Sequence, residues 1–261
     1  MLLKLDKDFA LFYGIMLGDG CLSEYLNRGY KMRIIAITGS SLDDLPFFKE
    51  VISPLLKKFR NKESKIKFRK NANTIDFNFQ DKELFDFIHA QGFPVGKKRT
   101  KLFIPKVFYD KGLVEYVIQG FFATDGSLVI TKNNNTFYPR VEANGIAKRL
   151  IKEINDYICS RGINSHLYHA KRKQSFGFGS SNQDRVQING IKNSILFNKI
   201  IGLVNPKHNR KFNKILAYYK EYKYQTKGVH SHKVRPIYEK LNKDFEIIMS
   251  RERFELSASG L

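Results

Sequence analysis

Two aspartates, Asp19 and Asp125, stand in matching sequence contexts and could together hold a metal ion. The segment FALFYGIMLGDG covers residues 9–20 and VIQGFFATDG covers residues 117–126; each is an apolar, helix-like stretch that ends in Asp-Gly. Two carboxylates at adjacent helix ends repel each other, and an oxygen-seeking cation such as Mg²⁺ would relieve that repulsion. The alternative is that each Asp-Gly simply ends a helix, with the glycine in left-handed geometry. Because both segments match, we favour the metal site.

Both segments also carry small residues spaced four apart, which is one helical turn. Glycine inside a helix costs about 0.5–1 kcal/mol relative to alanine, so close packing of two backbones is the expected compensation. If the two helices pack side by side and parallel, Asp19 and Asp125 meet at their C-terminal ends. The residues of this predicted helix seam are Gly14, Gly18, Gly120 and Thr124.

The elements that follow each aspartate recur in the same order, which predicts an α+β fold of two tandem, pseudo-symmetric αββαββα halves with antiparallel sheets. We assign residues 1–112 and 113–225 to the halves and residues 226–261 to a polar extension with a helix near 236–250. In the first half the strands are expected at 32–38, 65–69 and 74–79 and the helices at 45–59 and 82–91. In the second half the strands are expected at 127–131, 138–143, 165–170 and 185–189 and the helices at 146–160 and 192–201.

The charge balance predicts a nucleic-acid partner. Lys and Arg number 46 against 25 Asp and Glu, a net charge of +21, and a polyanion is the usual partner of such an excess. A basic surface kept for solubility or for anionic lipid is the alternative. The two cysteines lie outside any CxxC pattern and no apolar run reaches the roughly 18 residues of a membrane span, so we expect a soluble, intracellular protein.

The segments FYGIMLGDG (residues 12–20) and IQGFFATDG (residues 118–126) resemble the two copies of the motif that names the LAGLIDADG homing endonucleases, and the resemblance extends over about residues 8–215. It implies a monomer whose saddle-shaped sheets cover a long duplex DNA site, with parallel motif helices between the halves. It also implies Mg²⁺-dependent hydrolysis of both strands to staggered ends, with two or three ions shared between Asp19 and Asp125. Mn²⁺ is expected to substitute for Mg²⁺, and Ca²⁺ to support binding without cleavage. The alternatives are an RNA-splicing maturase that binds its own intron RNA and a non-cleaving nucleic-acid-binding protein on the same scaffold.

The resemblance assigns metal binding to Asp19 and Asp125, with help from the backbone carbonyls of Gly18 and Thr124. A lysine near the end of each half is expected to organise water: Lys97 aligns with Lys207, and Lys98 aligns nearly as well. The family often places a glutamine at the end of the second strand, where this chain has Gly39–Ser40 and Asn144–Gly145. Asn144 could hold a water and Gly39 cannot, so one half either uses different water contacts or cuts its strand more slowly.

Several predicted strands alternate polar and apolar side chains, which predicts one polar face and one core face. A face that mixes Arg, Asn, Gln and Asp suits base edges in a DNA major groove, although an ordinary solvated face is the commoner meaning of alternation. In residues 65–69 we expect the cations on the polar face and Ile66 and Phe68 in the core. The candidate DNA-contacting residues are Lys31, Arg33, Lys65, Lys67, Arg69, Thr74, Asp76, Asn78, Arg140, Glu142, Lys171, Arg172, Arg185, Gln187 and Asn189.

Overall fold

Two four-stranded antiparallel sheets with the same strand order form the framework of the protein. The structure, a computed structural model, describes residues 3–60, 65–69, 72–133, 136–173 and 180–225. The strand orders are β1-β2-β4-β3 and β5-β6-β8-β7. The strands of the first sheet are β1 (Gly20–Asn27), β2 (Tyr30–Ser40), β3 (Lys67–Phe68) and β4 (Thr74–Gln80). Those of the second are β5 (Gly126–Asn133), β6 (Thr136–Gly145), β7 (Ser165–Lys173) and β8 (Ser180–Asn189).

The two halves repeat in register as well as in order. Gly20 pairs with Ile37 in the first sheet, and Gly126 pairs with Ala143 in the second. Each residue of the second pair follows its counterpart in the first pair by the same number of residues that separates Asp125 from Asp19. The predicted α+β fold of two αββαββα halves is therefore confirmed. The first strand of each half begins directly after the aspartate, and the first of them, β1, was not predicted.

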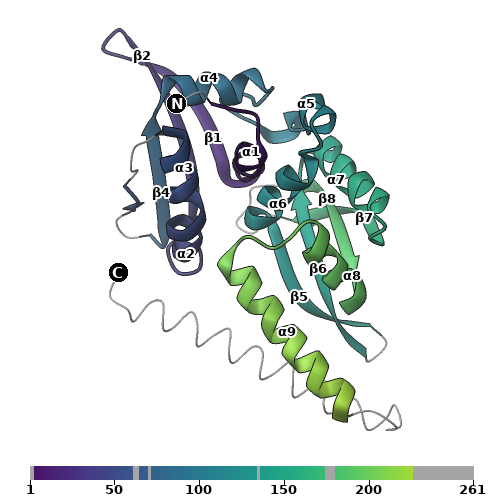
Figure 1. Cartoon of the computed structure of the whole chain (residues 1–261). Coiled ribbons are helices and arrows are strands. Elements are labelled where there is room, and N and C mark those ends of the chain that lie inside the picture. The colour runs from purple at the N-terminus through teal and green to yellow at the C-terminus, as the bar shows by residue number, and fades with distance from the viewer. Residues whose placement is uncertain (1–2, 61–64, 70–71, 134–135, 174–179, 226–261) are drawn as a thin grey trace.

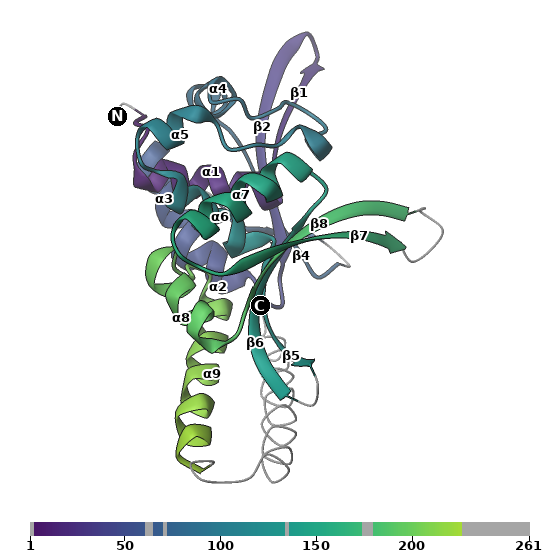
Figure 2. The same ribbon diagram turned by 90° about the vertical axis from the view of Figure 1, so that its right-hand side faces the viewer.

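The helices form a layer on one side of both sheets. Figure 1 shows α1 (Lys7–Asp19) and α6 (Val114–Thr124) next to each other between the sheets, and Figure 2 shows the helices on the left and the strands on the right. We call the strand surfaces turned away from the helices the open faces. None of the helices in the described ranges is both long and apolar enough to span a membrane. The remaining helices are α2 (Leu45–Phe47), η1 (Phe48–Ile52), α3 (Ser53–Arg60), α4 (Lys82–Ala90), η2 (Arg99–Lys101), α5 (Lys106–Asp110), α7 (Lys148–Ser160), α8 (Ile191–Ile200) and α9 (Pro206–Gln225).

The helix expected at 45–59 is present but is interrupted. Its middle, η1, is a π-helix, and Pro54 lies two residues beyond the end of η1. Proline has no N–H to give to the carbonyl four residues earlier, so the normal hydrogen-bond ladder cannot continue through this point. The helix α9 was not predicted, and the helix expected near 236–250 lies outside the described residues.

The core lies between each sheet and its helices. In β4, Ile75 and Phe77 are fully buried while Asn78 is exposed, which is the alternation expected of a strand with one covered face. Aromatic rings join the elements: the Phe9 ring of α1 lies 4.7 Å from that of Phe87 in α4. This packing fixes the motif helices against the sheets, and with them the aspartates at their ends.

Candidate active site and nucleic-acid interface

The motif helices α1 and α6 touch backbone to backbone along the predicted seam. A Cβ atom on Gly14 would lie 2.0 Å from the Val117 carbonyl oxygen, and one on Gly120 would lie 2.1 Å from that of Leu11. No side chain fits at such distances, so glycine is required at both positions.

The two helices run parallel. Gly14 of α1 lies against Val117 of α6. One turn later in α1, Gly18 lies against Thr124, which also comes later in α6. Neighbouring residues therefore advance in the same direction along both helices. The C-terminal ends of α1 and α6 meet at the same end of the seam.

Asp19 and Asp125 lie at that shared end. Asp19 is the last residue of α1, and Asp125 directly follows α6. Gly20 has φ −82° and ψ 158°, which is extended backbone that starts β1, so the left-handed helix-end alternative does not hold there. Asp19 is partly exposed and Asp125 is exposed. Both carboxylates are reachable from solvent.

The pKa values of both aspartates are raised, as expected of carboxyl groups that would bind a cation. Burial, followed by the nearby carboxylates of Asp125 and Asp44, raises the pKa of Asp19 to about 7, against the opposing charges of Lys98 and Lys207. Burial among surrounding atoms also raises the pKa of Asp125, whose carboxylate still reaches solvent, and Lys98 opposes that rise. Added positive charge would therefore stabilise both ionised carboxylates.

Lys98 is the lysine of the first half that reaches the site. Its Nζ donates hydrogen bonds to the carbonyl oxygens of Leu17 (2.9 Å), Met16 (3.3 Å) and Gly18. These carbonyls lie in the last turn of α1, where helical N–H partners run out, although that of Met16 also accepts from the Gly20 N–H. Burial lowers the pKa of Lys98, and the carboxylates of Asp125 and Asp19 oppose that change. Lys97, by contrast, is an exposed residue.

In the second half, a neutral amide side chain binds the C-terminal end of the motif helix α6. The buried side chain of Asn205 donates from Nδ2 to the Ala123 carbonyl oxygen (2.8 Å), and its Oδ1 accepts from the Lys207 N–H (3.1 Å). His208, in the same segment, is also buried, and burial followed by the charge of Lys207 lowers its pKa to about 3. The two helix ends are therefore chemically different.

Lys207 pairs with an acid that the sequence did not single out. Its Nζ forms an ion pair with Asp44, whose other carboxylate oxygen accepts from the Ser40 N–H (2.9 Å). This contact joins the two halves, because Asp44 follows β2 and Lys207 lies in α9. An aspartate just before Leu45-Pro46 is typical of a helix start, which hides its nearness to Asp19.

The donor atoms at the seam fit a hard divalent cation. Among the described residues no three or more His, Cys, Asp or Glu side chains group closely enough to form a complete protein cage. Mg²⁺ does not need one, since it commonly takes one or two carboxylates and fills its other positions with water and phosphate oxygens. Asp19 and Asp125 supply the carboxylates. The Gly18 carbonyl, an expected ligand, accepts a hydrogen bond from Lys98.

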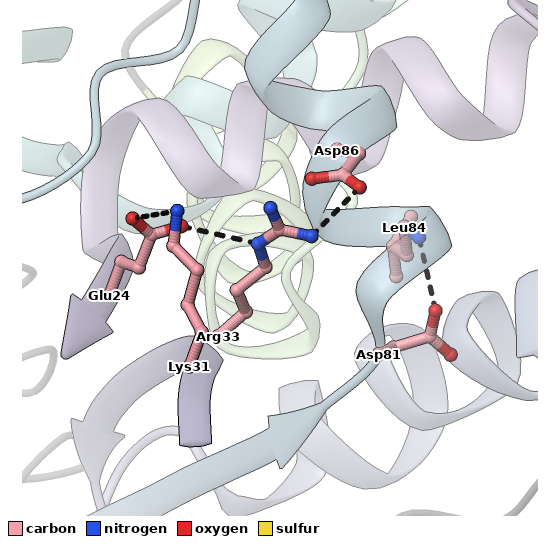
Figure 3. A network of polar contacts seen from close by, with 6 residues as sticks. All are labelled: Glu24, Lys31, Arg33, Asp81, Leu84 and Asp86. Carbon is pink, nitrogen blue, oxygen red and sulfur yellow. Dashed lines mark hydrogen bonds and ion pairs between the residues drawn. The ribbon is translucent and has the colours of Figure 1, made fainter. Parts of the chain in front are cut away.

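The structure corrects the predicted placement of Lys31 and Arg33. They share a face of β2 with the buried Ile35, which is the helix-covered face. Arg33 binds Asp86 of α4 (Nη1 to Oδ2, 3.1 Å), and Arg33 (Nε to Oε2, 3.2 Å) and Lys31 (2.8 Å) both bind Glu24 of β1, as Figure 3 shows. Apolar residues occur on both faces of β2, so the alternation in the sequence could not show which face the helices cover. Neither residue lies on an open face.

Most of the other candidates do lie on the open faces. Arg69 makes a two-pronged contact with Asp76 (2.9 Å for both nitrogens). Phe68 is 47% exposed, so its predicted place in the core was wrong; β3 is a short edge strand and covers it poorly. Lys171 and Arg172 lie in β7, but their side chains are outside the described part. The open-face candidates within or next to described strands are Lys65, Lys67, Arg69, Thr74, Asp76, Asn78, Arg140, Glu142, Asn144, Arg185, Gln187 and Asn189.

Comparison with known proteins places this fold. No model of a known protein family matches the sequence, and no curated protein matches it. Among solved structures, the LAGLIDADG meganuclease I-AabMI bound to uncleaved DNA has a TM-score of 0.53 at 13% identity, covering 90% of this chain and 98% of that one. The meganuclease I-SmaMI bound to uncleavable DNA also has a TM-score of 0.53 at 13% identity, covering 90% and 96%. The chain therefore has the two-domain fold of the LAGLIDADG meganucleases.

Proposed function

We propose that this protein is a site-specific DNA endonuclease of the LAGLIDADG type, which makes a staggered double-strand break by metal-dependent hydrolysis. The observation that carries the proposal is the pair of matched carboxylates, Asp19 and Asp125, at one end of a parallel helix seam. I-AabMI and I-SmaMI, which share the fold, are described as DNA-bound, and the +21 charge suits the same partner. A non-cleaving binder or a maturase would not require both acids.

In this proposal Asp19 and Asp125 hold the metal, with the carbonyls of Gly18 and Thr124 beside them. Bound Mg²⁺, or Mn²⁺ in its place, would supply charge neutralisation at the phosphate and a more acidic water. The residues themselves orient the phosphodiester. Lys98 places a positive charge near both carboxylates and binds the carbonyls at the end of α1. Lys207 provides the cation of the other half once a phosphate competes with Asp44.

The two halves are proposed to cut at different rates. Asn144 is the water-positioning candidate of the second half, and its Oδ1 accepts from Arg185 Nε (2.7 Å), which fixes its orientation. In the first half the repeat places Thr38, not the expected Gly39, at the equivalent position, so a short hydroxyl side chain stands where the second half has an amide. In the second half the Asn205 side chain binds a carbonyl at the end of α6, whereas in the first half Lys98 binds the carbonyls at the end of α1. We therefore expect one strand to be nicked before the other.

One chain is proposed to be the complete enzyme. Residues 1–112 and 113–225 each supply one aspartate and one sheet, so both strands of a duplex can be reached without a second copy. A long duplex site follows from the two sheets lying along one molecule. We therefore propose a monomer that acts on double-stranded DNA.

The decisive experiment is selection of cut sites from a random duplex library with Mg²⁺. We expect the wild-type protein to cut both strands of a specific site. Asp19→Asn and Asp125→Asn should bind that site in Ca²⁺ with near wild-type affinity and fail to cut it, since each removes one metal-binding carboxylate. Asp110→Asn, which changes an acid on α5 that pairs only with Lys106 in the contacts seen here, is the matched control and should cut normally. Cutting of both strands at the wild-type rate by either site variant contradicts the assignment.

A further inference from the structure

The two open faces differ at positions that the repeat makes equivalent. Because β2 and β6 keep the same register against β1 and β5, residues separated by the Asp19-to-Asp125 spacing occupy matching places. Ile34 thus matches Arg140, and Ala36 matches Glu142. The same scaffold therefore carries opposite chemistry in its two halves.

The open face of β2 is apolar. Ile35 and Ile37 are fully buried against the helices, so Met32, Ile34 and Ala36 point the other way, and each is partly exposed. None of these three belongs to the core or packs against it. Apolar surface left toward solvent is stabilised when a partner covers it. In the DNA major groove the apolar group is the thymine methyl.

The open face of β6 and β8 carries two arginines held in fixed directions. Arg140 donates from Nε to Asn189 (3.1 Å) and from Nη1 to Glu142 (3.4 Å). Arg185 donates from Nε to Asn144 (2.7 Å), with Nη1 3.7 Å from the same Glu142. A guanidinium whose plane is fixed in advance loses less entropy when it makes a two-pronged contact, and the common base partner for such a contact is guanine.

We propose that the target is asymmetric in base type: G·C pairs lie under Arg140 and Arg185, and A·T pairs lie under Ile34 and Ala36, with Ile34 at the place that the repeat relates to Arg140. This inference rests on the proposed function and adds which bases each half reads. Duplex DNA is the partner favoured by both faces, since RNA lacks the thymine methyl and its deep, narrow major groove is closed to side chains.

Selection of bound duplexes from a random library in Ca²⁺, where no cleavage is needed, tests the inference. Wild-type sites should carry A·T under Ile34 and Ala36 and G·C under Arg140 and Arg185, so that the related positions under Ile34 and Arg140 differ in base type. Arg140→Ile, which copies the residue of the first half, should weaken binding to the G·C site by about 5- to 150-fold and lose the preference at that position alone. Arg33→Ile makes the same change on the helix-covered face and should leave every base preference unchanged.

A second test changes the DNA and leaves the protein intact, so it does not depend on a variant folding. Deoxyuridine in place of thymine under Ile34 removes one methyl group and should weaken binding about fourfold, while deoxyuridine in place of a thymine outside the bound site should have no effect. Sites with the same base type at both related positions, or indifference to the methyl group, would overturn this inference and leave DNA binding standing. Failure to enrich any duplex would overturn the proposed function as well.

Discussion

The carboxyl of Asp19 titrates near neutrality, because burial and the neighbouring acids Asp125 and Asp44 raise its pKa to about 7. In the unfolded chain the same group has a pKa of about 3.9. Between these values this carboxyl binds more protons in the folded protein than in the unfolded one. Its contribution to the free energy of unfolding of the metal-free protein therefore falls as the pH rises from about 4 to about 7, whereas that of His208, whose pKa is lowered to about 3, has the opposite sign.

The first prediction concerns this pH dependence. In EDTA, Asp19→Asn should raise the melting temperature above that of wild type more at about pH 8 than at about pH 5, because it removes the titrating group while the opposing contribution of His208 is the same in both proteins. Mg²⁺ should raise the melting temperature at pH 8, where the carboxylates are ionised, far more than at pH 5. Asp110→Asn serves as the control. An unchanged pH dependence in Asp19→Asn would show that this carboxyl is not the group responsible.

The adjacent lysines Lys97 and Lys98 allow a matched comparison. Lys98→Met should lower the cleavage rate by about 100-fold, because it removes the cation beside both carboxylates, and it should leave DNA binding in Ca²⁺ within about threefold. Lys97→Met makes the identical change at an exposed position and should change the rate less than about twofold. Single-turnover cleavage with binding measured in parallel gives both numbers. Equal losses in the two variants would mean that Lys98 has no special place in the site.

At the scale of elements, the close contact of α1 and α6 gives a prediction about stability. Gly14→Ala would put a Cβ atom 2.0 Å from a backbone oxygen of α6, and a backbone clash in the core cannot relax by rotating a side chain. We expect a loss of more than about 3 kcal/mol in the free energy of unfolding, measured by urea denaturation. Lys82→Ala, on the exposed start of α4, should change it by less than about 0.5 kcal/mol. A well-tolerated Gly14→Ala would show that the helices are farther apart.

Elements with a strong period were predictable from the sequence, and those that depend on tertiary contacts were not. The strands β4 and β6 and the helix α7 show clear hydrophobic periods, and the motif helices α1 and α6 are apolar runs that the matching halves made recognisable. The helix α9 was not predicted, although His208, Phe212 and Ile215 lie on one buried face of it. The segment is rich in Lys and Asn, and a histidine is counted as polar in such a pattern even where the fold buries it. Arg33 was misplaced because the face that helices cover is a property of packing, which a strand's own sequence does not record.

The same limit applies to the site. Asp19 and Asp125 could be found because each ends a repeated motif. Asp44 and Asn205 occur once, without a counterpart in the other half, and reach the site only through the crossing of α2 and α9. Repetition in the sequence therefore reveals what the two halves share, whereas the features that distinguish them appear only in the structure.

At the scale of the whole molecule, the +21 charge and the placement of its cations bear on DNA affinity. Many Arg and Lys side chains are already paired within the protein, as in the contacts of Arg33 with Asp86 and of Lys207 with Asp44. Only protein cations that contact phosphates release counterions from the DNA. The slope of log affinity against log salt concentration therefore measures how many such contacts form. With sheets in both halves along a long duplex, six to ten such contacts are a reasonable expectation.

We therefore predict that affinity for the selected duplex falls by about 10³- to 10⁵-fold between about 50 mM and 200 mM salt. Lys67→Ala removes an exposed cation of the first open face and should lower the slope of log Kd against log salt by about one, uniformly across DNA sequences. Lys152→Ala removes an equal charge from the helix layer, where it pairs with Asp156, and should leave the slope unchanged. Titrations at several salt concentrations in Ca²⁺ measure both slopes. A wild-type slope smaller than about three, or equal effects of the two variants, would mean that the open faces are not where the phosphates lie.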